Sequence, residues 1–471
     1  MPTLDPLEIR LPEQPDRYSA IDPLDSRYYD HEVAKHLSER SRVAYQAYLE
    51  AALAQALADE GVCSQRIADE ITAAARTVNI EDVERHELVT KHDIKAVVNT
   101  IKDGISDEAK PFVHFGATSN DIISSATALQ LRTATLELVI PRIDALLATL
   151  IELSEKYADT TQIGRTHGQH GVPLTFGYYL SGYVSRLGTS RMALVDLANN
   201  LRGKFSGAVG AYNALSLFVD DPLAFEKKVL STVGLKPAEF SSQIVPSEQF
   251  ARLIDELAIA ANIMANVCHD MRNLQRTEIG EVREKFEKGQ TGSSTMAHKR
   301  NPWNFENVIS MSKQVNAQLI NVNMNIVSEH QRDLTDSSSG RFYGIVFASI
   351  AEMSSRLNRI MSKIEVDEAA MQTNLKITGG AIAAEPLYLL LEKHGHTAAH
   401  EVIKELSHAA LAQGKTLAET AAADESIAAY WDKLSENEKQ IIIEPEFNYV
   451  GIASSKAGMI TAQWREKLSL T

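Results

Sequence analysis

Four long segments in the middle of the chain repeat apolar residues at alternating spacings of three and four. They span residues 126–150, 253–274, 308–326 and 346–364, and the second contains no Gly or Pro. This spacing keeps one face of a helix against its neighbours. We therefore predict several helices of about 30 residues, each roughly 45 Å long at 1.5 Å per residue, that pack as a near-parallel bundle.

The length of these helices bears on the assembly state. Helices this long exceed what a compact monomer of 471 residues usually needs, and their apolar stripes can exceed what one bundle covers. We expect bundles from several subunits to pack together. A self-contained monomeric bundle is the alternative.

Shorter helical patterns flank the long segments. Residues 31–110 alternate Ala- and Leu-rich stretches with polar joints, as in 43–60, which Gly61 stops. After Ile364 the helices shorten and are broken by Gly379, Gly380, Pro386, Gly395 and Gly414. No alternating strand pattern or βαβ spacing stands out. We predict an all-α, three-domain protein with an N-terminal helical domain (1–111), a central long-helix bundle (112–364) and a small C-terminal helical domain (365–471).

The start of the chain and its cysteine content indicate where in the cell the protein is found. The first twenty residues contain four prolines and few apolar residues, which is typical of an extended or mobile arm. Acids and prolines also stand where a signal peptide would have a basic patch and an apolar run. We therefore expect a cytoplasmic protein, and the two cysteines, far apart in sequence, fit a reducing compartment.

Charge and hydropathy narrow the classes of partner. With 47 Lys and Arg against 62 Asp and Glu, the formal net charge is −15, which repels polyanions, so we expect no nucleic-acid partner. The longest charge-free run, 166–185, contains two histidines, four glycines and a proline, so we expect no membrane segment. A small anionic substrate would have to be bound by a few locally placed cations.

Four polar stretches lie between or at the ends of the long helices, and they are rich in residues that orient polar ligands. In the first, Thr118 and Ser119 stand just before a helix, where hydroxyls and free amides can cap the helix or hold a carboxylate. For Ser119 and Asp121 a plain N-cap is an equally good interpretation. In the second, residues 164–173, His167 and His170 lie among three glycines in a tight turn that can present an imidazole proton. A metal site is disfavoured, because neither Cys nor carboxylate ligands lie nearby.

The third stretch, 289–302, runs from small flexible residues into a basic cluster and a helix begun by Pro302. Such a loop can close on an anion and bring Ser293, Lys299 and Asn301 to it. The order of residues does not match a phosphate-binding P-loop or the Ser-x-x-Lys of penicillin-recognising enzymes. The fourth stretch, 329–341, separates Arg332 and Arg341 by three serines, which suits a bidentate grip on phosphate or carboxylate. A solvated helix cap is the alternative.

Together these motifs resemble the aspartase/fumarase superfamily. Residues 292–302 resemble the signature loop of this superfamily. The stretches 114–119 and 164–168 precede them in the order that the family shows. Within the superfamily the likeness is greatest to the adenylosuccinate lyase family, through residues 26–28, 91–93, 206–213 and 331–337. The likeness covers about residues 21–460. It implies an all-helical homotetramer whose bundle forms the tetramer core and whose active sites each take residues from three subunits.

The resemblance also implies a reaction. Members release fumarate by β-elimination from an N-succinyl purine nucleotide, with no cofactor and no metal: adenylosuccinate gives AMP, and the succinylated aminoimidazole carboxamide ribotide gives its carboxamide. By motif position Ser293 resembles the base and His167 the acid, while Glu306 resembles the carboxylate that polarises the acid histidine. Ser294, next to Ser293, is less suited to be the base.

The remaining site residues are implied by the same matching. The carboxylates of fumarate would be held by Thr118, Ser119, Lys299 and Asn301. The nucleotide phosphate and ribose would be held by Arg27, Tyr28, Arg332 and the run Ser337, Ser338, Ser339, Gly340 and Arg341. The pocket would be completed by Lys91, His92, Asp93, Gln243, Ser294, Arg300 and Asn307.

Two positions depart from the family's pattern, and two other functions stay open. Ala297 stands where the family usually has proline, which would loosen the loop without removing a catalytic group. His170, in a variable stretch, can compete with His167 for the acid role. Another superfamily lyase, such as argininosuccinate lyase or carboxymuconate cycloisomerase, is disfavoured by Arg27 and by the cations at 332 and 341, which a substrate without phosphate would not need. A binding or structural protein on the same scaffold, as in lens crystallins, is disfavoured by the intact Ser293, His167 and Lys299.

Overall fold

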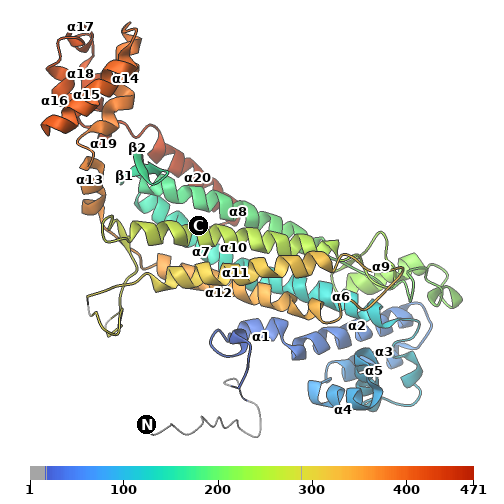
Figure 1. Ribbon diagram of the computed structural model, residues 1–471. Coiled ribbons are helices and arrows are strands. Elements are labelled where there is room, and N and C mark those ends of the chain that lie inside the picture. The colour runs from blue at the N-terminus through green and yellow to red at the C-terminus, as the bar shows by residue number, and fades with distance from the viewer. Residues whose placement is uncertain (1–15, 17–18, 288, 297, 471) are drawn as a thin grey trace, which may run out of the picture. The chain divides into compact units, whose positions relative to one another are not determined.

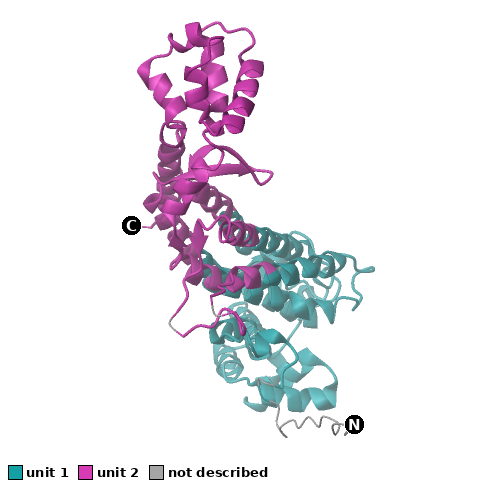
Figure 2. Ribbon diagram, turned by 60° about the vertical axis from the view of Figure 1, so that its left-hand side comes forward, with its two compact units in different colours: residues 1–143, 190–262, 310–354 teal, residues 144–189, 263–309, 355–471 magenta. Residues whose placement is uncertain are grey.

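Helices dominate the computed structural model, which describes residues 16, 19–287, 289–296 and 298–470 (Figure 1). The described chain forms two compact units, coloured separately in Figure 2. Unit 1 comprises residues 1–143, 190–262 and 310–354, and unit 2 comprises 144–189, 263–309 and 355–471. The predicted mobile arm lies almost entirely outside the described residues. The three predicted domain ranges stay a prediction.

Five helices contain the points at which the chain passes from one unit to the other. They are α7 (Ile140–Lys156), α8 (Phe176–Asn199), α10 (Glu248–Leu274), α11 (Trp303–Met324) and α12 (Tyr343–Met361). The patterns at 126–150, 253–274, 308–326 and 346–364 correspond to α6–α7, α10, α11 and α12. The 27 residues of α10 approach the predicted length, whereas α11 and α12 have 22 and 19.

Burial along α10 confirms its predicted apolar stripe. All seven stripe residues are buried, from Leu253 and Leu257 at 0% exposure to Leu274 at 7%. The first stripe departs from the prediction, because a π-helical turn (Ala134–Val139) joins α6 (Ser119–Thr133) to α7. A π turn holds more residues than an α turn and so rotates the helix face. Thr135 and Leu138 are buried there, whereas Leu136, which the spacing of three and four within 126–150 places on the apolar face, is half-buried.

Unit 1 also contains the N-terminal helices, in which α2 packs against α3, α5, α6 and α9. As predicted, α2 ends beside Gly61, which has a φ of 73°. The other elements of this unit are η1 (Pro23–Asp25), α1 (His31–Leu37), α2 (Glu39–Asp59), α3 (Gln65–Ala75), α4 (Ile80–Thr90), α5 (Asp93–Asp103), η2 (Lys110–Phe112), β3 (Arg202–Gly203), η4 (Leu215–Leu217), α9 (Pro222–Thr232), β4 (Lys236–Pro237) and η5 (Ser339–Phe342).

Unit 2 contains an antiparallel hairpin of β1 (Thr161–Thr166) and β2 (Gln169–Thr175), which the sequence pattern did not predict. A second short pair joins β5 (Val282–Arg283) to β6 (Glu365–Val366). The remaining elements are α13 (Glu368–Lys376), η6 (Ala381–Ala383), α14 (Ala384–Lys393), α15 (Ala399–Gln413), α16 (Leu417–Ala422), α17 (Ala428–Trp431), α18 (Glu436–Ile443), α19 (Pro445–Asn448) and α20 (Ala453–Leu468).

The C-terminal helices share a core of their own. Leu387, Leu391, Ile403 and Leu417 belong to one buried apolar cluster contributed by α14 to α18. The sequence pattern predicted a helix break at Pro386, and this prediction was wrong. Pro386 lies in the first turn of α14, where a missing N–H costs no helical hydrogen bond.

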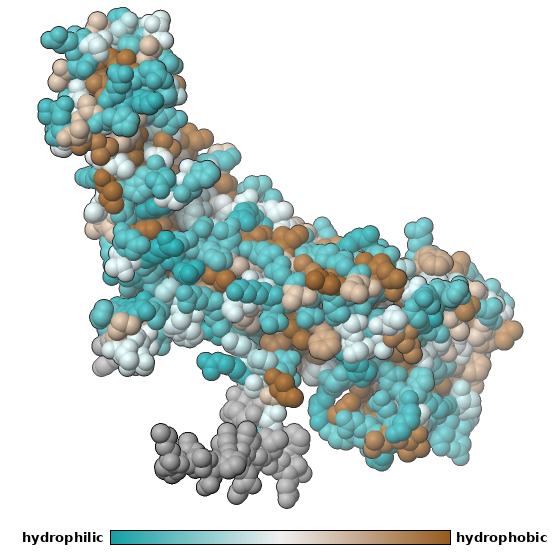
Figure 3. Space-filling model, in the orientation of Figure 1, coloured by the Kyte–Doolittle hydropathy of each residue, from teal (hydrophilic) through white to brown (hydrophobic). Residues whose placement is uncertain are grey.

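The surface of unit 1 carries exposed apolar side chains on its long helices, and Figure 3 shows apolar side chains in brown over this part of the chain. The exposed residues on α8, α10, α11 and the turn after α11 include Met192, Ile259, Ile320, Met324 and Val327. Within the described residues, no helix combines the length and apolar character needed to cross a membrane.

Candidate active site

The predicted site residues are distributed over both units. Those in unit 1 are Arg27, Tyr28, Lys91, His92, Asp93, Thr118, Ser119, Gln243, Arg332, Ser337, Ser338, Ser339, Gly340 and Arg341. Those in unit 2 are His167, Ser293, Ser294, Lys299, Arg300, Asn301, Glu306 and Asn307. The predicted base and acid therefore belong to the same unit.

His167 lies at the tip of the β1–β2 hairpin. Thr166 pairs with Gln169, so His167 and Gly168 form a two-residue turn, with φ angles of 54° and 73°. Positive φ at both central residues defines a type I′ turn, whose backbone twist matches that of the flanking strands. His167 is exposed at this tip. An imidazole in this position can meet a ligand and transfer a proton near neutral pH.

Gly164 allows the two strands to approach each other. A Cβ atom at this position would lie 2.6 Å from the carbonyl oxygen of Val172 on the opposite strand. The strand register also shifts here, between Ile163 and Arg165. The glycine and the bulge together form the irregular base of the hairpin whose tip is His167.

His170 pairs with Arg165 across the hairpin. Burial, and next the charge of Arg165, lower the pKa of His170, so less of its imidazole is protonated near neutral pH. This favours His167 for the acid role. No group of three or more His, Cys, Asp or Glu residues in the described chain could hold a metal ion, and the absence of a metal stays a prediction.

The loop that carries Ser293 is folded tightly on itself. A Cβ atom at Gly292 would lie 2.0 Å from the carbonyl oxygen of Lys299, and the Asn301 side chain donates a hydrogen bond to the Gly292 carbonyl at 2.9 Å. The hydroxyl oxygen of Ser293 accepts hydrogen bonds from the backbone N–H of Met296 at 3.1 Å and of Thr295 at 3.4 Å. Such amides stabilise negative charge on an oxygen.

The cations of this loop face solvent. Lys299 and Arg300 are exposed, as is Ser294, whereas Ser293 is half-buried. Gln275 donates to the Arg300 carbonyl at 3.3 Å. The departure noted at Ala297 lies outside the described residues.

The first turns of α11 carry Glu306 and Asn307. Glu306 forms an ion pair with Arg272, at 3.2 Å between Oε1 and Nε. The predicted contact between Glu306 and His167 stays a prediction.

The N-terminus of α6 positions Thr118 and Ser119. Thr118 is the N-cap residue and Ser119 begins the helix, while the Asp121 carboxylate accepts a hydrogen bond from the Thr118 N–H at 2.8 Å. The plain N-cap considered for Ser119 and Asp121 is therefore wrong: Thr118 is the N-cap, Ser119 is the first helical residue, and Asp121 caps the helix from its third position. The partial positive charge at the start of a helix favours an anion here.

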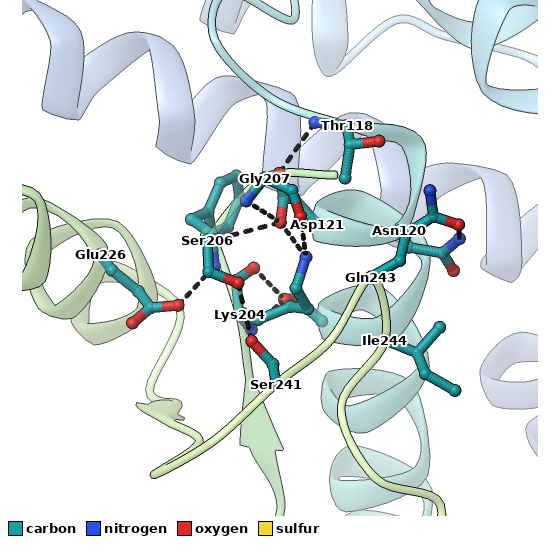
Figure 4. Close-up of polar contacts among 12 residues, drawn as sticks. Thr118, Asn120, Asp121, Lys204, Ser206, Gly207, Glu226, Ser241, Gln243 and Ile244 are labelled. Carbon is teal, nitrogen blue, oxygen red and sulfur yellow. Dashed lines mark hydrogen bonds and ion pairs between the residues drawn. The ribbon is translucent and has the colours of Figure 1, made fainter. Parts of the chain in front are cut away.

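Asp121 also joins α6 to the 204–207 segment (Figure 4). Its Oδ1 forms a buried ion pair with Lys204 and accepts hydrogen bonds from the N–H groups of Ser206 and Gly207, at 3.1 and 3.2 Å. The Ser206 hydroxyl in turn lies 2.7 Å from that of Ser241. The sequence analysis gave Lys204 no role. The pattern that could have indicated one is the position of this lysine next to a Gly- and Ala-rich stretch.

Gln243 connects two further predicted stretches. Its side-chain oxygen accepts a hydrogen bond from the Asn120 side chain at 3.3 Å (Figure 4). Its backbone N–H donates to the Gln331 carbonyl at 3.1 Å. The start of α6, Gln243 and the residue before Arg332 are thus brought together within unit 1, although they are far apart in the sequence.

Arg332 has unused donors in a largely buried position. Its side chain is 15% exposed and Nη2 forms an ion pair with Asp336 at 2.9 Å. Within the described chain, Nε and Nη1 are buried without a hydrogen-bond partner. Buried guanidinium N–H groups without acceptors are costly unless a ligand supplies them. Phosphate and carboxylate oxygens form charge-assisted hydrogen bonds with such donors.

The serine run after Arg332 leads into α12. The Ser339 hydroxyl donates to Asn325 at 2.6 Å, and Arg341 pairs with Glu39 at 3.2 Å on the surface. Ser337 and Ser338 are exposed, and Gly340 is half-buried. Among the described residues, Arg341 therefore forms an exposed ion pair with Glu39.

The remaining predicted residues lie in the N-terminal helices. Lys91, with a φ of 53°, ends α4, and His92 is the N-cap of α5, where its Nδ1 accepts from the Lys95 N–H at 3.4 Å. Asp93 Oδ2 lies 3.9 Å from Arg42 Nη1. Arg27 is exposed and Tyr28 is half-buried.

Comparison with known families covers nearly all of the chain. Residues 25–317 match the family described as Lyase, and residues 328–442 match the family described as Adenylosuccinate lyase C-terminal. An adenylosuccinate lyase from Pyrococcus abyssi is 36% identical over 440 residues, which cover 92% of this chain and 96% of the relative. An adenylosuccinate lyase from Archaeoglobus fulgidus is 33% identical over 452 residues, covering 95% of this chain and 99% of the relative.

Solved structures share the fold. The 3-carboxy-cis,cis-muconate lactonizing enzyme from Pseudomonas putida aligns with a TM-score of 0.82 at 26% identity, covering 95% of this chain and 100% of that chain. The fumarate lyase from Mesorhizobium sp. BNC1 aligns with a TM-score of 0.81 at 23% identity, covering 92% and 98%. These likenesses confirm the predicted all-α class.

Proposed function

This chain belongs to the adenylosuccinate lyases of the fumarate lyase superfamily, and from that premise we propose how its residues divide the reaction. The substrate is adenylosuccinate, which gives AMP and fumarate, and the succinylated aminoimidazole carboxamide ribotide reacts in the same way. In both, a base removes a proton from the succinyl carbon beside a carboxylate, and an acid protonates the departing nitrogen. The electron pair of the broken C–H bond becomes the new double bond of fumarate.

Ser293 is the proposed base. A serine hydroxyl is a weak base and needs stabilisation of its alkoxide. The N–H groups of Met296 and Thr295 already donate to its oxygen, and Lys299 lies in the same loop. Closure of the loop over the substrate would exclude water and strengthen these interactions.

His167 is the proposed acid. It is exposed at the tip of a hairpin in the same unit as Ser293. An imidazole can hold a proton at neutral pH and release it to the departing nitrogen. Glu306 is the proposed partner that polarises this imidazole.

Two anion-binding groups are proposed for the rest of the substrate. The start of α6, with Thr118 and Ser119, and the loop residues Lys299 and Asn301 hold the carboxylates. Arg332 holds the phosphate, and this role is supported by its two buried donors that have no partner among the described residues. Arg27, Tyr28 and the residues from Ser337 to Arg341 complete the nucleotide pocket, together with Lys91, His92, Asp93, Gln243, Ser294, Arg300 and Asn307.

We also propose a homotetramer in which each site takes residues from several subunits. The exposed apolar side chains of Ile259, Ile320 and Met324 on the long helices, and of Val327 in the turn after α11, support such an assembly, because they lose contact with water when helices of other subunits cover them. We place the enzyme in the cytoplasm, and the free, buried state of Cys63 and Cys268 is compatible with that.

The observation that carries the proposed substrate is that two buried N–H donors of Arg332, Nε and Nη1, have no hydrogen-bond partner among the described residues. The shared fold does not separate adenylosuccinate lyases from carboxymuconate enzymes or argininosuccinate lyases, whereas a site for phosphate does. The direct test follows fumarate release with adenylosuccinate and argininosuccinate side by side. We expect release from adenylosuccinate, and release from argininosuccinate alone would refute the proposal. A scaffold protein without activity would release fumarate from neither.

A further inference from the structure

Glu281 holds a fully buried carboxylate at the base of the hairpin that carries His167. Its side chain is 0% exposed, and it accepts hydrogen bonds from four side-chain N–H groups. Arg165 donates twice, at 2.6 and 3.1 Å, to the two carboxylate oxygens, and Gln162 and Asn374 donate at 2.7 Å each. The carboxylate is therefore fully satisfied by three residues.

Two of these donors belong to the strand that leads to His167. Gln162 and Arg165 both lie on β1, and Arg165 is two positions before His167. Asn374 lies on α13 and also donates to the Ile279 carbonyl at 2.9 Å. The first strand is thus joined to Glu281 by its polar side chains, in addition to the packing of Ile163 against Leu375 and Ile382.

Glu281 is also the residue from which the Ser293 segment departs. It directly precedes β5, which pairs with β6, and the chain then runs into the loop 289–302. One side of the carboxylate therefore holds the strand of the proposed acid, and its own backbone begins the segment of the proposed base. This connection lies wholly within unit 2.

Stability alone does not explain a charged group here. Removing a carboxylate from water costs several kcal/mol, and well-packed apolar residues in place of a buried ion pair are often as stable or more stable. A bidentate Arg–carboxylate pair instead fixes the direction as well as the distance of its partner. A two-stranded hairpin on its own is marginally stable, so it needs such an anchor if its tip is to be held in place.

We propose that Glu281 is a positioning residue that acts through Arg165 and Gln162 to hold the general acid His167 in place. The proposal rests on the proposed function, in which His167 donates the proton. Glu281 does not touch the substrate in this scheme. Removing its charge frees the hairpin and lowers the fraction of encounters in which the imidazole meets the departing nitrogen.

The test is a double-mutant cycle with Glu281→Gln, His167→Ala and the combined variant. In the wild-type background Glu281→Gln should lower kcat by about 10- to 100-fold, the usual effect of losing a residue that orients a reacting group, with KM changed less than about threefold. In the His167→Ala background it should lower the residual kcat no further, because the acid that it positions is already absent. Equal losses in both backgrounds would overturn the proposal.

Glu155→Gln is the matched control. Glu155 forms a bidentate pair with Arg465, at 2.8 Å for both bonds, in the same unit, with side chains 38% and 30% exposed. This control should keep the wild-type kcat. If Glu281→Gln does not fold, Arg165→Lys, which keeps the charge and loses the fork, replaces it in the same cycle with a smaller expected loss of kcat.

Hydrogen exchange separates the anchor from the chemistry. Amides of residues 164–170 should exchange faster in Glu281→Gln than in the wild type, while those of 119–131 on α6 and those in Glu155→Gln should not change. Unchanged exchange at the hairpin would contradict the anchor. A wild-type enzyme that releases no fumarate from adenylosuccinate, with faster exchange in the variant, would instead contradict the proposed function.

Discussion

Lys204 and Asp121 form an ion pair in which the two side chains are 0% and 1% exposed. The two partners differ in their other contacts. Asp121 also accepts from the N–H groups of Thr118, Ser206 and Gly207, whereas Lys204 has one further acceptor, the Gly207 carbonyl at 3.1 Å. If Lys204 is removed, the Asp121 carboxylate therefore keeps three N–H donors. If the charge of Asp121 is removed, the Lys204 ammonium group keeps only the Gly207 carbonyl.

Asp121→Asn should destabilise the protein more than Lys204→Met. Breaking a buried ion pair from one side costs about 3–5 kcal/mol. We expect Asp121→Asn to reach that range, because the ammonium group loses its counter-charge, and Lys204→Met to fall below it, because three N–H groups still face the carboxylate. Urea unfolding monitored by circular dichroism measures both.

The control for this pair is Arg40→Gln, which removes an ion pair with Glu81 that is 67% and 61% exposed. Exposed pairs contribute about 0–1 kcal/mol. The reverse ranking, with Lys204→Met the more damaging, would show that the backbone N–H groups do not stabilise the isolated carboxylate.

Ser293→Ala and His167→Ala should each lower kcat by at least about 100-fold with the fold retained, because each removes one of the two proton-transfer groups. Fumarate release gives the rate and circular dichroism checks the fold. Ser294→Ala, one residue along, should change KM more than kcat. Near-normal turnover in either of the first two variants would refute the role assigned to that residue.

Arg332→Gln should raise KM for adenylosuccinate by about 10- to 100-fold, which corresponds to the loss of one or two charge-assisted hydrogen bonds. Inhibition by inorganic phosphate should weaken in parallel, because the same guanidinium N–H groups would bind it. Steady-state kinetics with and without phosphate measure both effects. An unchanged KM would exclude Arg332 from the phosphate site.

Stability should depend on pH through His114 and Glu50, whose Nδ1 and Oε1 atoms lie 2.6 Å apart. Burial by itself would lower the pKa of His114, but the charge and hydrogen bond of the Glu50 carboxylate outweigh it, and the pKa is raised above its ordinary value of 6.5. The pair's contribution is therefore complete below about pH 6.5 and is lost as the pH rises through the raised value.

Glu50→Gln reveals this dependence. The difference in urea midpoint between wild type and Glu50→Gln should be larger at pH 6 than at pH 9. Asp103→Asn, which removes the exposed partner of His86, is the control and should show a smaller difference at both pH values. A difference that grows with pH would contradict the assignment.

The parts of the fold that periodic burial determines could be predicted from the sequence. The stripe of α10 is buried along its whole length, as its spacing of three and four predicts. The π turn at 134–139 could not be predicted, because one extra residue per turn leaves the composition unchanged. The β1–β2 hairpin was missed because Gly164, Gly168 and Gly171 obscure the alternation expected of strands.

The site was predictable as motifs but not as contacts. The residues at 118–119, 167 and 293 stand out because Gly, Ser, Thr and His are concentrated at the ends of apolar helices. The contacts around these residues come from distant parts of the chain. Glu281 binds Arg165, which lies near His167, and the Gln331 carbonyl binds Gln243. Only folding brings these pairs together, and no local pattern encodes them.

The turn conformation of His167 restricts any redesign of the proton donor. Its φ of 54° lies in a region that glycine, asparagine, aspartate and histidine tolerate and that β-branched or bulky residues avoid. An engineer who wishes to exchange the imidazole for an acid of different strength can therefore choose aspartate without straining the chain. Valine or threonine at this position would distort the support of the proton donor as well as its chemistry.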